Sequence, residues 1–280
     1  MSGSTTGATC SASPAIEPRM ISARDFLVRG LLAGLFAGLV AFAVAYIVGE
    51  PSVNAAIAIE ESAGLDHGHP ADEPTASDEA GGTEVPRSLQ STVGLLTATT
   101  VAGVTLGGLV GVISALVLGR FGRLGVRGVS LSVATIGFVS VSLMPFVAYP
   151  PNPPAVGDPD TIGTRSALFF IMLAISIIAA ATAVLVGRKL AARWGAWYAT
   201  LSAIGGYLLV TLSAVALLPS YSEVPDDFPA SVLYEFRVAS LITQLALWAM
   251  LGLALGELLY RLQRRTAAHV AEPVYAEQSH

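Results

Sequence analysis

Six long apolar runs without a charged residue constrain this chain more than any other feature of its sequence. A helix rises about 1.5 Å per residue, so roughly 20 apolar residues cross a hydrocarbon core about 30 Å thick. Charged residues make up 12% of the chain, whereas about 25% is usual in a soluble domain. We therefore expect an all-α, polytopic membrane helix bundle with six transmembrane helices. They are predicted at residues 30–48, 93–118, 129–149, 166–187, 196–218 and 238–256.

Lysine and arginine residues alternate between the segments that connect these helices. Twelve of the 15 bases lie in four segments: before the first run, and after the second, fourth and sixth. They are Arg19, Arg24, Arg29, Arg120, Arg123, Arg127, Arg188, Lys189, Arg193, Arg261, Arg264 and Arg265. The other three segments hold one base each. Because basic segments stay in the cytoplasm, both termini are predicted inside and the acidic loops outside.

The predicted membrane domain covers residues 24–262. A disordered cytoplasmic N-terminal tail covers residues 1–23, and a cytoplasmic C-terminal tail covers residues 263–280. The acidic outer loop, residues 50–92, has too little apolar surface to order most of its length. Its beginning differs, because Pro51 suits the first turn of a helix and apolar residues follow. We expect a short helix on the membrane surface there.

Glycines recur at every fourth position in three of the predicted helices, which allows close helix contact. They are Gly30, Gly34 and Gly38, then Gly103, Gly107 and Gly111, and finally Gly252 and Gly256. Two interpretations fit this spacing: packing within the bundle, or a face reserved for a partner helix or a sliding contact.

Signatures of soluble enzymes are missing from the sequence. It contains no P-loop, no dinucleotide-binding glycine motif, no zinc-protease motif and no nucleophile elbow. The single cysteine, Cys10, can form neither an intrachain disulfide nor a cysteine metal cluster. We predict a protein that is not an enzyme, carries no tightly bound cofactor and does not bind nucleic acid.

The first outward loop contains a candidate metal-capture site at Asp66, His67 and His69. Imidazole and carboxylate together suit borderline divalent ions such as Co²⁺, Ni²⁺ or Zn²⁺. Three further acids, Glu50, Glu60 and Glu61, could complete the coordination. The alternative is a solvated polar loop that contains two histidines by chance.

A proline-rich loop follows the third predicted helix and contains Tyr149, Asn152, Asp158, Asp160 and Arg165. Prolines stiffen its backbone, so the carboxylate and amide oxygens would stand in a rigid frame at the membrane mouth. Arg165 could pair with Asp158 or Asp160. The simpler account is that prolines end the third helix at Met144 and Pro145 and turn the chain back.

No Asp, Glu or His lies deep in a predicted span. An ion path would have to use backbone carbonyls, a partner's ligands or the side chains of Thr97, Thr99, Thr100, Thr105 and Met144. A non-conducting assembly or gating subunit is therefore an alternative to a permease.

Several motifs together resemble one known family. They are Glu50 with Pro51, the short histidine segment, Pro86 with Arg87 and Gln90, the loop from Tyr149 to Pro159, and Phe236 with Arg237, Ser240, Gln244 and Trp248. This set is similar to the CbtA family of cobalt transporter subunits. The resemblance implies a divalent-metal importer of the bacterial cytoplasmic membrane that transports Co²⁺. It also implies a small one-span, histidine-bearing CbtB-like partner.

Overall fold

The computed structural model describes most of the membrane part of the chain. The described residues are 22–66, 86, 89–120, 124–154, 156–157, 159–221, 224–225 and 227–277. Within these residues the regular structure is helical throughout, as the apolar runs predict. Five of the helices are long and apolar enough to cross a membrane.

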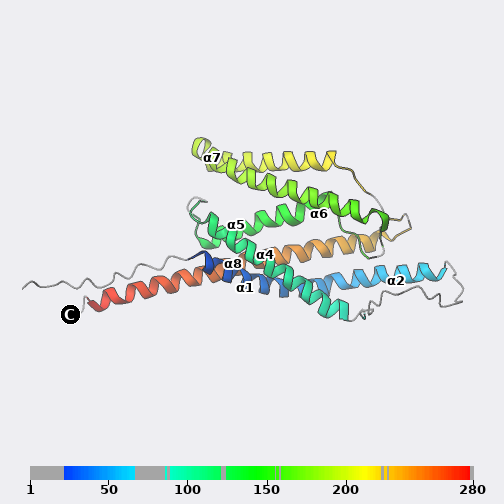
Figure 1. Cartoon of the computed structure of the whole chain (residues 1–280), viewed down its shortest axis with the longest axis horizontal. Helices are drawn as coiled ribbons and strands as arrows, with labels where there is room; N and C mark the ends of the chain where they lie inside the picture. Colours follow the sequence, from blue (N-terminus) through cyan, green and yellow to red (C-terminus); the bar gives the residue numbers. More distant parts are fainter. Residues whose placement is uncertain are drawn as a thin grey trace, which may run out of the picture.

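The first long helix combines three consecutive elements: α1 (Ala23–Val44), the π-helix η1 (Ala45–Gly49) and α2 (Glu50–Asp66). The helix predicted to begin near Pro51 is present, but it continues α1 in nearly the same direction in Figure 1. The expectation of a separate helix along the membrane surface was therefore wrong.

The next two spans form an antiparallel pair. The π-helix η2 (Gln90–Gly94) leads into α4 (Leu95–Val117). The return span consists of α5 (Val126–Gly137), the π-helix η3 (Phe138–Leu143) and α6 (Met144–Ala148). The helix thus passes through Pro145 and ends after Ala148, close to the predicted end at residue 149, and the alternative account, in which prolines end it at Met144 and Pro145, was wrong.

A π-helical turn precedes two of the prolines that lie inside long helices, Pro51 and Pro145. The amide of Glu50 donates to Ala45 O, and that of Met144 donates to Val139 O, five residues back in both cases. Proline lacks an amide hydrogen and its ring crowds the carbonyl four residues earlier. The wider turn changes the register before Pro51 and Pro145, which allows both helices to continue.

The short 3₁₀-helix η4 (Pro159–Thr161) leads into α7 (Ile162–Leu217), whose 56 residues would extend about 84 Å if straight. Gly195 interrupts it with φ +80° and ψ 162°, and Figure 1 shows two antiparallel legs. The predicted spans at 166–187 and 196–218 imply a connecting loop from residue 188 to 195. Residues 188–194 are instead helical, and the chain reverses at Gly195.

The last helix, α8 (Ala230–Glu277), extends well beyond its predicted span at both ends. It packs with α1, α5 and, less extensively, α4, while the α7 legs contact η3 and α6. In Figure 1 the start of α1, the α4–α5 turn and the Gly195 turn share one end of the bundle. We call it the basic end, since it carries the described bases Arg24, Arg29, Arg120, Arg127, Arg188, Lys189 and Arg193. The proline-rich loop lies at the other end, which we call the loop end.

Candidate functional site

The glycines of α1 and α4 face one another inside the chain. A Cβ atom on Gly34 would overlap the carbonyl oxygen of Gly103, and one on Gly107 would overlap that of Gly30. A Cβ on Gly38 would lie 2.7 Å from Thr99 O. The two backbones are therefore in direct contact, which only glycine allows. This face is occupied within the bundle and is not left open for a partner helix.

The remaining glycines of this set lie at similar contacts. Gly111 faces the backbone of Phe26, where a Cβ would stand 2.6 Å from the carbonyl oxygen. On α8, a Cβ on Gly252 would lie 2.8 Å from Ala134 Cβ, and one on Gly256 would lie 3.2 Å from Arg127 Cα. Small residues thus bring α1, α4, α5 and α8 together into one tight unit.

Arg237 of α8 binds the proline-rich loop at the loop end. Its Nε donates to Pro151 O (3.3 Å), and its Nη2 donates to Asn152 Oδ1 (3.0 Å). The Tyr149 hydroxyl donates to Pro219 O (3.0 Å) after α7. Burial raises the pKa of Tyr149, and Tyr221 adds to the shift. The hydroxyl therefore stays protonated and keeps its role as donor.

A cleft of about 370 Å³ opens between this loop and the first ends of α7 and α8. Tyr149, Asn152 and Arg165 line it, so the structure brings three of the predicted loop residues together. Asp160 lies on η4 and is not part of the lining, and Asp158 is outside the described residues. The Asn152 side-chain oxygen, expected at the membrane mouth, accepts a hydrogen bond from Arg237.

The metal-capture residues are only partly described. His67 and His69 are outside the described residues, and Asp66 is the last residue of α2. Glu50 begins this 17-residue helix, so about 24 Å of helix axis separates it from Asp66. Glu50 thus lies at the opposite end of α2 from Asp66, and its part in the capture site stays a prediction. In the described part of the chain, no three His, Cys, Asp or Glu side chains form a group that could hold a metal ion.

Most of the hydroxyls that we expected along an ion path bond to their own helix. Thr97, Thr99 and Thr105 each donate to a backbone carbonyl four residues earlier. The hydroxyl oxygen of Thr100 is buried without such a bond. Met144 lies in a small core beside α7. Together these side chains do not form a continuous polar path through the bundle.

A different polar chain crosses from α8 to η3. Trp248 Nε1 donates to Ser142 Oγ (2.9 Å), and Ser142 Oγ donates to Gln244 Oε1 (3.1 Å). The indole ring lies directly against Gly137, where no Cβ would fit. Arg237 lies at the loop end, and Gln244 lies about 10 Å further along α8, toward the middle of the bundle. The polar groups of Gln244, Ser142 and Trp248 therefore lie at membrane depth. Sequence reasoning noted Gln244 and Trp248 but assigned them no role; their i, i+4 spacing was the available signal.

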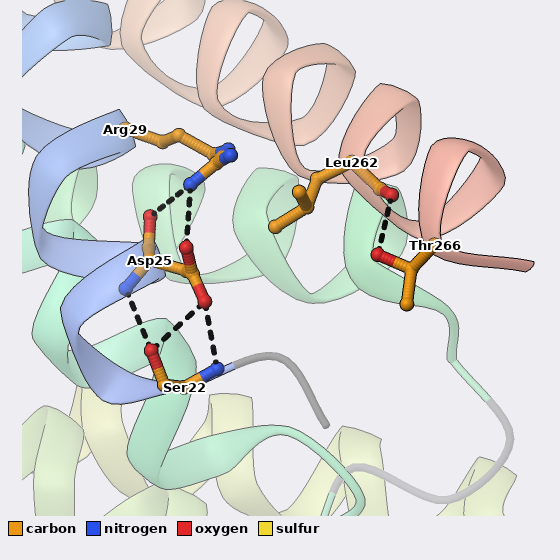
Figure 2. A network of polar contacts seen from close by, with 5 residues as sticks. All are labelled: Ser22, Asp25, Arg29, Leu262 and Thr266. Atoms are coloured by element: carbon orange, nitrogen blue, oxygen red, sulfur yellow. Dashed lines mark hydrogen bonds and ion pairs between the residues drawn. The ribbon is translucent and has the colours of Figure 1, made fainter. Parts of the chain in front are cut away.

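The basic end is held by polar contacts at the start of α1 and on α8. Ser22 and Asp25 form a capping box, and Arg29 Nη1 donates to Asp25 Oδ1 (3.1 Å), as Figure 2 shows. Figure 2 also shows Thr266 on the neighbouring stretch of α8. Nearby, Glu257 accepts hydrogen bonds from Arg127 and Arg261.

Comparison with protein families identifies the chain. The family model described as "Probable cobalt transporter subunit (CbtA)" matches residues 23–260, which is most of the chain. The chain belongs to the CbtA family. No significant match was found among curated proteins or among solved structures.

This CbtA-family chain is a multi-pass membrane protein, since the matched region contains all five membrane-length helices almost completely. It is a subunit of a transporter by the description of its family. The matched region includes the glycine-packed unit, the cleft and the polar chain from Trp248 to Gln244. These parts therefore belong to the transporter module and not to an appended domain.

Proposed function

We propose that the chain is the membrane subunit of a divalent-metal uptake transporter in the bacterial cytoplasmic membrane, with Co²⁺ as its cargo. The observation that carries this proposal is the family match over residues 23–260. A membrane bundle without an ATP-binding motif would depend on other components or on an ion gradient for its driving force.

The bundle crosses the membrane six times with both termini in the cytoplasm. Each leg of α7 is long enough to cross, since Gly195 divides its 56 residues into 162–194 and 196–217. The clustering of bases at one end supports placing that end in the cytoplasm.

Reporter fusions test this topology. We expect a cytoplasmic signal from fusions at Arg193 and after Glu277, and an external signal from fusions at Ala76 and Gly157. A cytoplasmic signal at Ala76 would contradict the assignment.

The outer loop captures the ion through Asp66, His67 and His69. Two further acids, Glu60 and Glu61, lie on α2 within two turns of Asp66. The acidic face raises the local cation concentration, and the imidazoles select a borderline ion. The helix bundle then passes the ion inward.

Isothermal titration of the detergent-solubilised chain with Co²⁺ tests the capture site. His67→Ala combined with His69→Ala should weaken binding, and binding by the parent should fade below about pH 6 as the imidazoles protonate. His269→Ala is a matched control elsewhere in the chain. Unchanged Co²⁺ binding in the double variant would show that the loop is a solvated linker and not a capture site.

Within the membrane, the polar groups of Ser142 and Gln244 are candidates for contact with the passing ion. Two oxygens alone cannot complete the coordination of a divalent cation. A small one-span, histidine-bearing CbtB-like partner supplies further ligands in this proposal, and the family description as a subunit supports the presence of a partner.

A second candidate function is a non-conducting assembly or gating subunit. The predicted spans contain no Asp, Glu or His, the side chains that usually mark ion paths in membranes. In this alternative the partner conducts the ion, and the chain only anchors it.

A further inference from the structure

The cleft at the loop end is lined by two arginines. Arg165 of α7 and Arg237 of α8 both line it. Its other polar lining residues are Tyr149, Asn152, Ser166 and Tyr221, and no Asp or Glu is among the described residues that line it. The described residues of the lining thus contribute two positive charges and no negative one.

The positively charged guanidinium group of Arg237 forms its hydrogen bonds with neutral groups. The side chain is half-buried, and its two hydrogen bonds go to the uncharged oxygens of Pro151 and Asn152. No carboxylate of the described residues forms an ion pair with it. These bonds use Nε and one N–H of Nη2, and a guanidinium has five N–H donors in a fixed fork. Arg237 is thus held in place with donors remaining for a further acceptor.

The opposite wall of the cleft adds positive potential. Ile162, the first residue of α7, lines the cleft together with Arg165 one turn later. The amide groups and the dipole of a helix start favour an anion, in addition to the arginine charges.

We propose that this cleft binds a phosphate-type oxyanion, with Arg237 and Arg165 as its charged ligands. A guanidinium fork matches the geometry of phosphate oxygens and binds them more tightly than neutral donors do. The phosphate belongs either to a lipid headgroup or to a free anion. The aromatic side chains of Phe169 and Phe170 form the apolar wall beside it, and Phe170 is 63% exposed.

The binding test uses the full chain in a non-ionic detergent without cobalt, so it is independent of the proposed metal transport. Isothermal titration is carried out with inorganic phosphate, with short-chain phosphatidylglycerol and with the matching diacylglycerol, which lacks phosphate. Arg237→Gln and Arg165→Gln remove one charge each from the cleft. Arg188→Gln, at an exposed position of α7 near its Gly195 turn at the basic end, is the matched control.

We expect saturable binding of a phosphate-bearing probe. Its affinity should fall about tenfold or more in both cleft variants, because a charge-assisted hydrogen bond is lost. The affinity should be unchanged in Arg188→Gln. Binding of both phosphate probes would support a site for the phosphate group itself. Binding of phosphatidylglycerol alone would support a lipid headgroup. Equal binding of diacylglycerol, no binding of either phosphate probe, or unchanged binding in the Arg165→Gln variant would overturn the proposal.

Discussion

Glycines have opposite surroundings in the two halves of this bundle. In the pair α1 and α4, Gly34 and Gly107 press against the backbone of the facing helix. In the second leg of α7, Gly205 and Gly206 have no atom within 4 Å of the position that a Cβ would take. The same residue type thus serves close packing in one region and leaves an open surface in the other.

The two regions also differ in their cores. The unit of α1, α4, α5 and α8 buries one continuous apolar cluster that includes Phe26, Val129, Trp248 and Leu255. The α7 hairpin shares a much smaller cluster around Met144, Met172 and Tyr207. A buried bond between Ser176 Oγ and the Tyr207 hydroxyl (2.8 Å) ties its two legs together. The glycine-packed unit, which we call the scaffold, is thus the more tightly packed of the two regions, and the α7 hairpin is the more loosely packed one.

The largest effect should come from adding bulk to the scaffold. Gly34→Leu forces a side chain into the backbone of Gly103 and should lower the free energy of unfolding by about 3 kcal/mol or more. Thermal unfolding in detergent, followed by size-exclusion chromatography, measures this loss.

Gly205→Leu is the matched control for this substitution. The added side chain would meet no neighbour and would face lipid, so we expect a thermal unfolding midpoint close to that of the parent. If the Gly34→Leu and Gly205→Leu variants are equally stable, the contrast between the two regions is incorrect.

A smaller effect should follow from changing the turn of the hairpin. Gly195 has φ +80° and ψ 162°, a conformation that is essentially restricted to glycine, so Gly195→Ala should cost about 1–3 kcal/mol. Because the strain is local, it should loosen α7 and leave the scaffold intact.

Disulfide formation between cysteines at positions 187 and 203 reports on the hairpin, since a Cβ on Gly187 would lie 3.1 Å from Ala203 Cβ. In a Cys10→Ser background we expect this disulfide to form readily, and to form more slowly after Gly195→Ala. Gly206→Ala should leave its rate unchanged. An unchanged rate in the Gly195→Ala variant would show that the turn does not depend on glycine.

Much of this architecture could be predicted because membrane helices leave strong patterns. Apolar runs of about 20 residues mark helices wherever lipid forces every backbone group to bond internally. Gly30, Gly34 and Gly38 recur at every fourth residue and therefore lie on one helical face. Only a second face of small residues can approach this face so closely.

The remaining features depend on partners distant in sequence or on local register. The stretch from Arg188 to Arg193 resembles a loop by its charge, yet these residues are also good helix formers and only Gly195 breaks the helix. Pro145 would normally end a helix, but the preceding π-helical turn accommodates it. Arg237 and Asn152 are 85 positions apart, so nothing local indicates that one holds the other.

Transport by purified components tests the central claim most directly. The chain and its one-span partner are reconstituted together into vesicles that contain calcein, whose fluorescence Co²⁺ quenches, and vesicles with the partner alone serve as the control. We expect external Co²⁺ to quench the dye only when this chain is present, and more slowly after Gln244→Leu, which removes a polar group at membrane depth. Equal quenching by the partner alone would contradict the claim and would leave this chain as an assembly subunit.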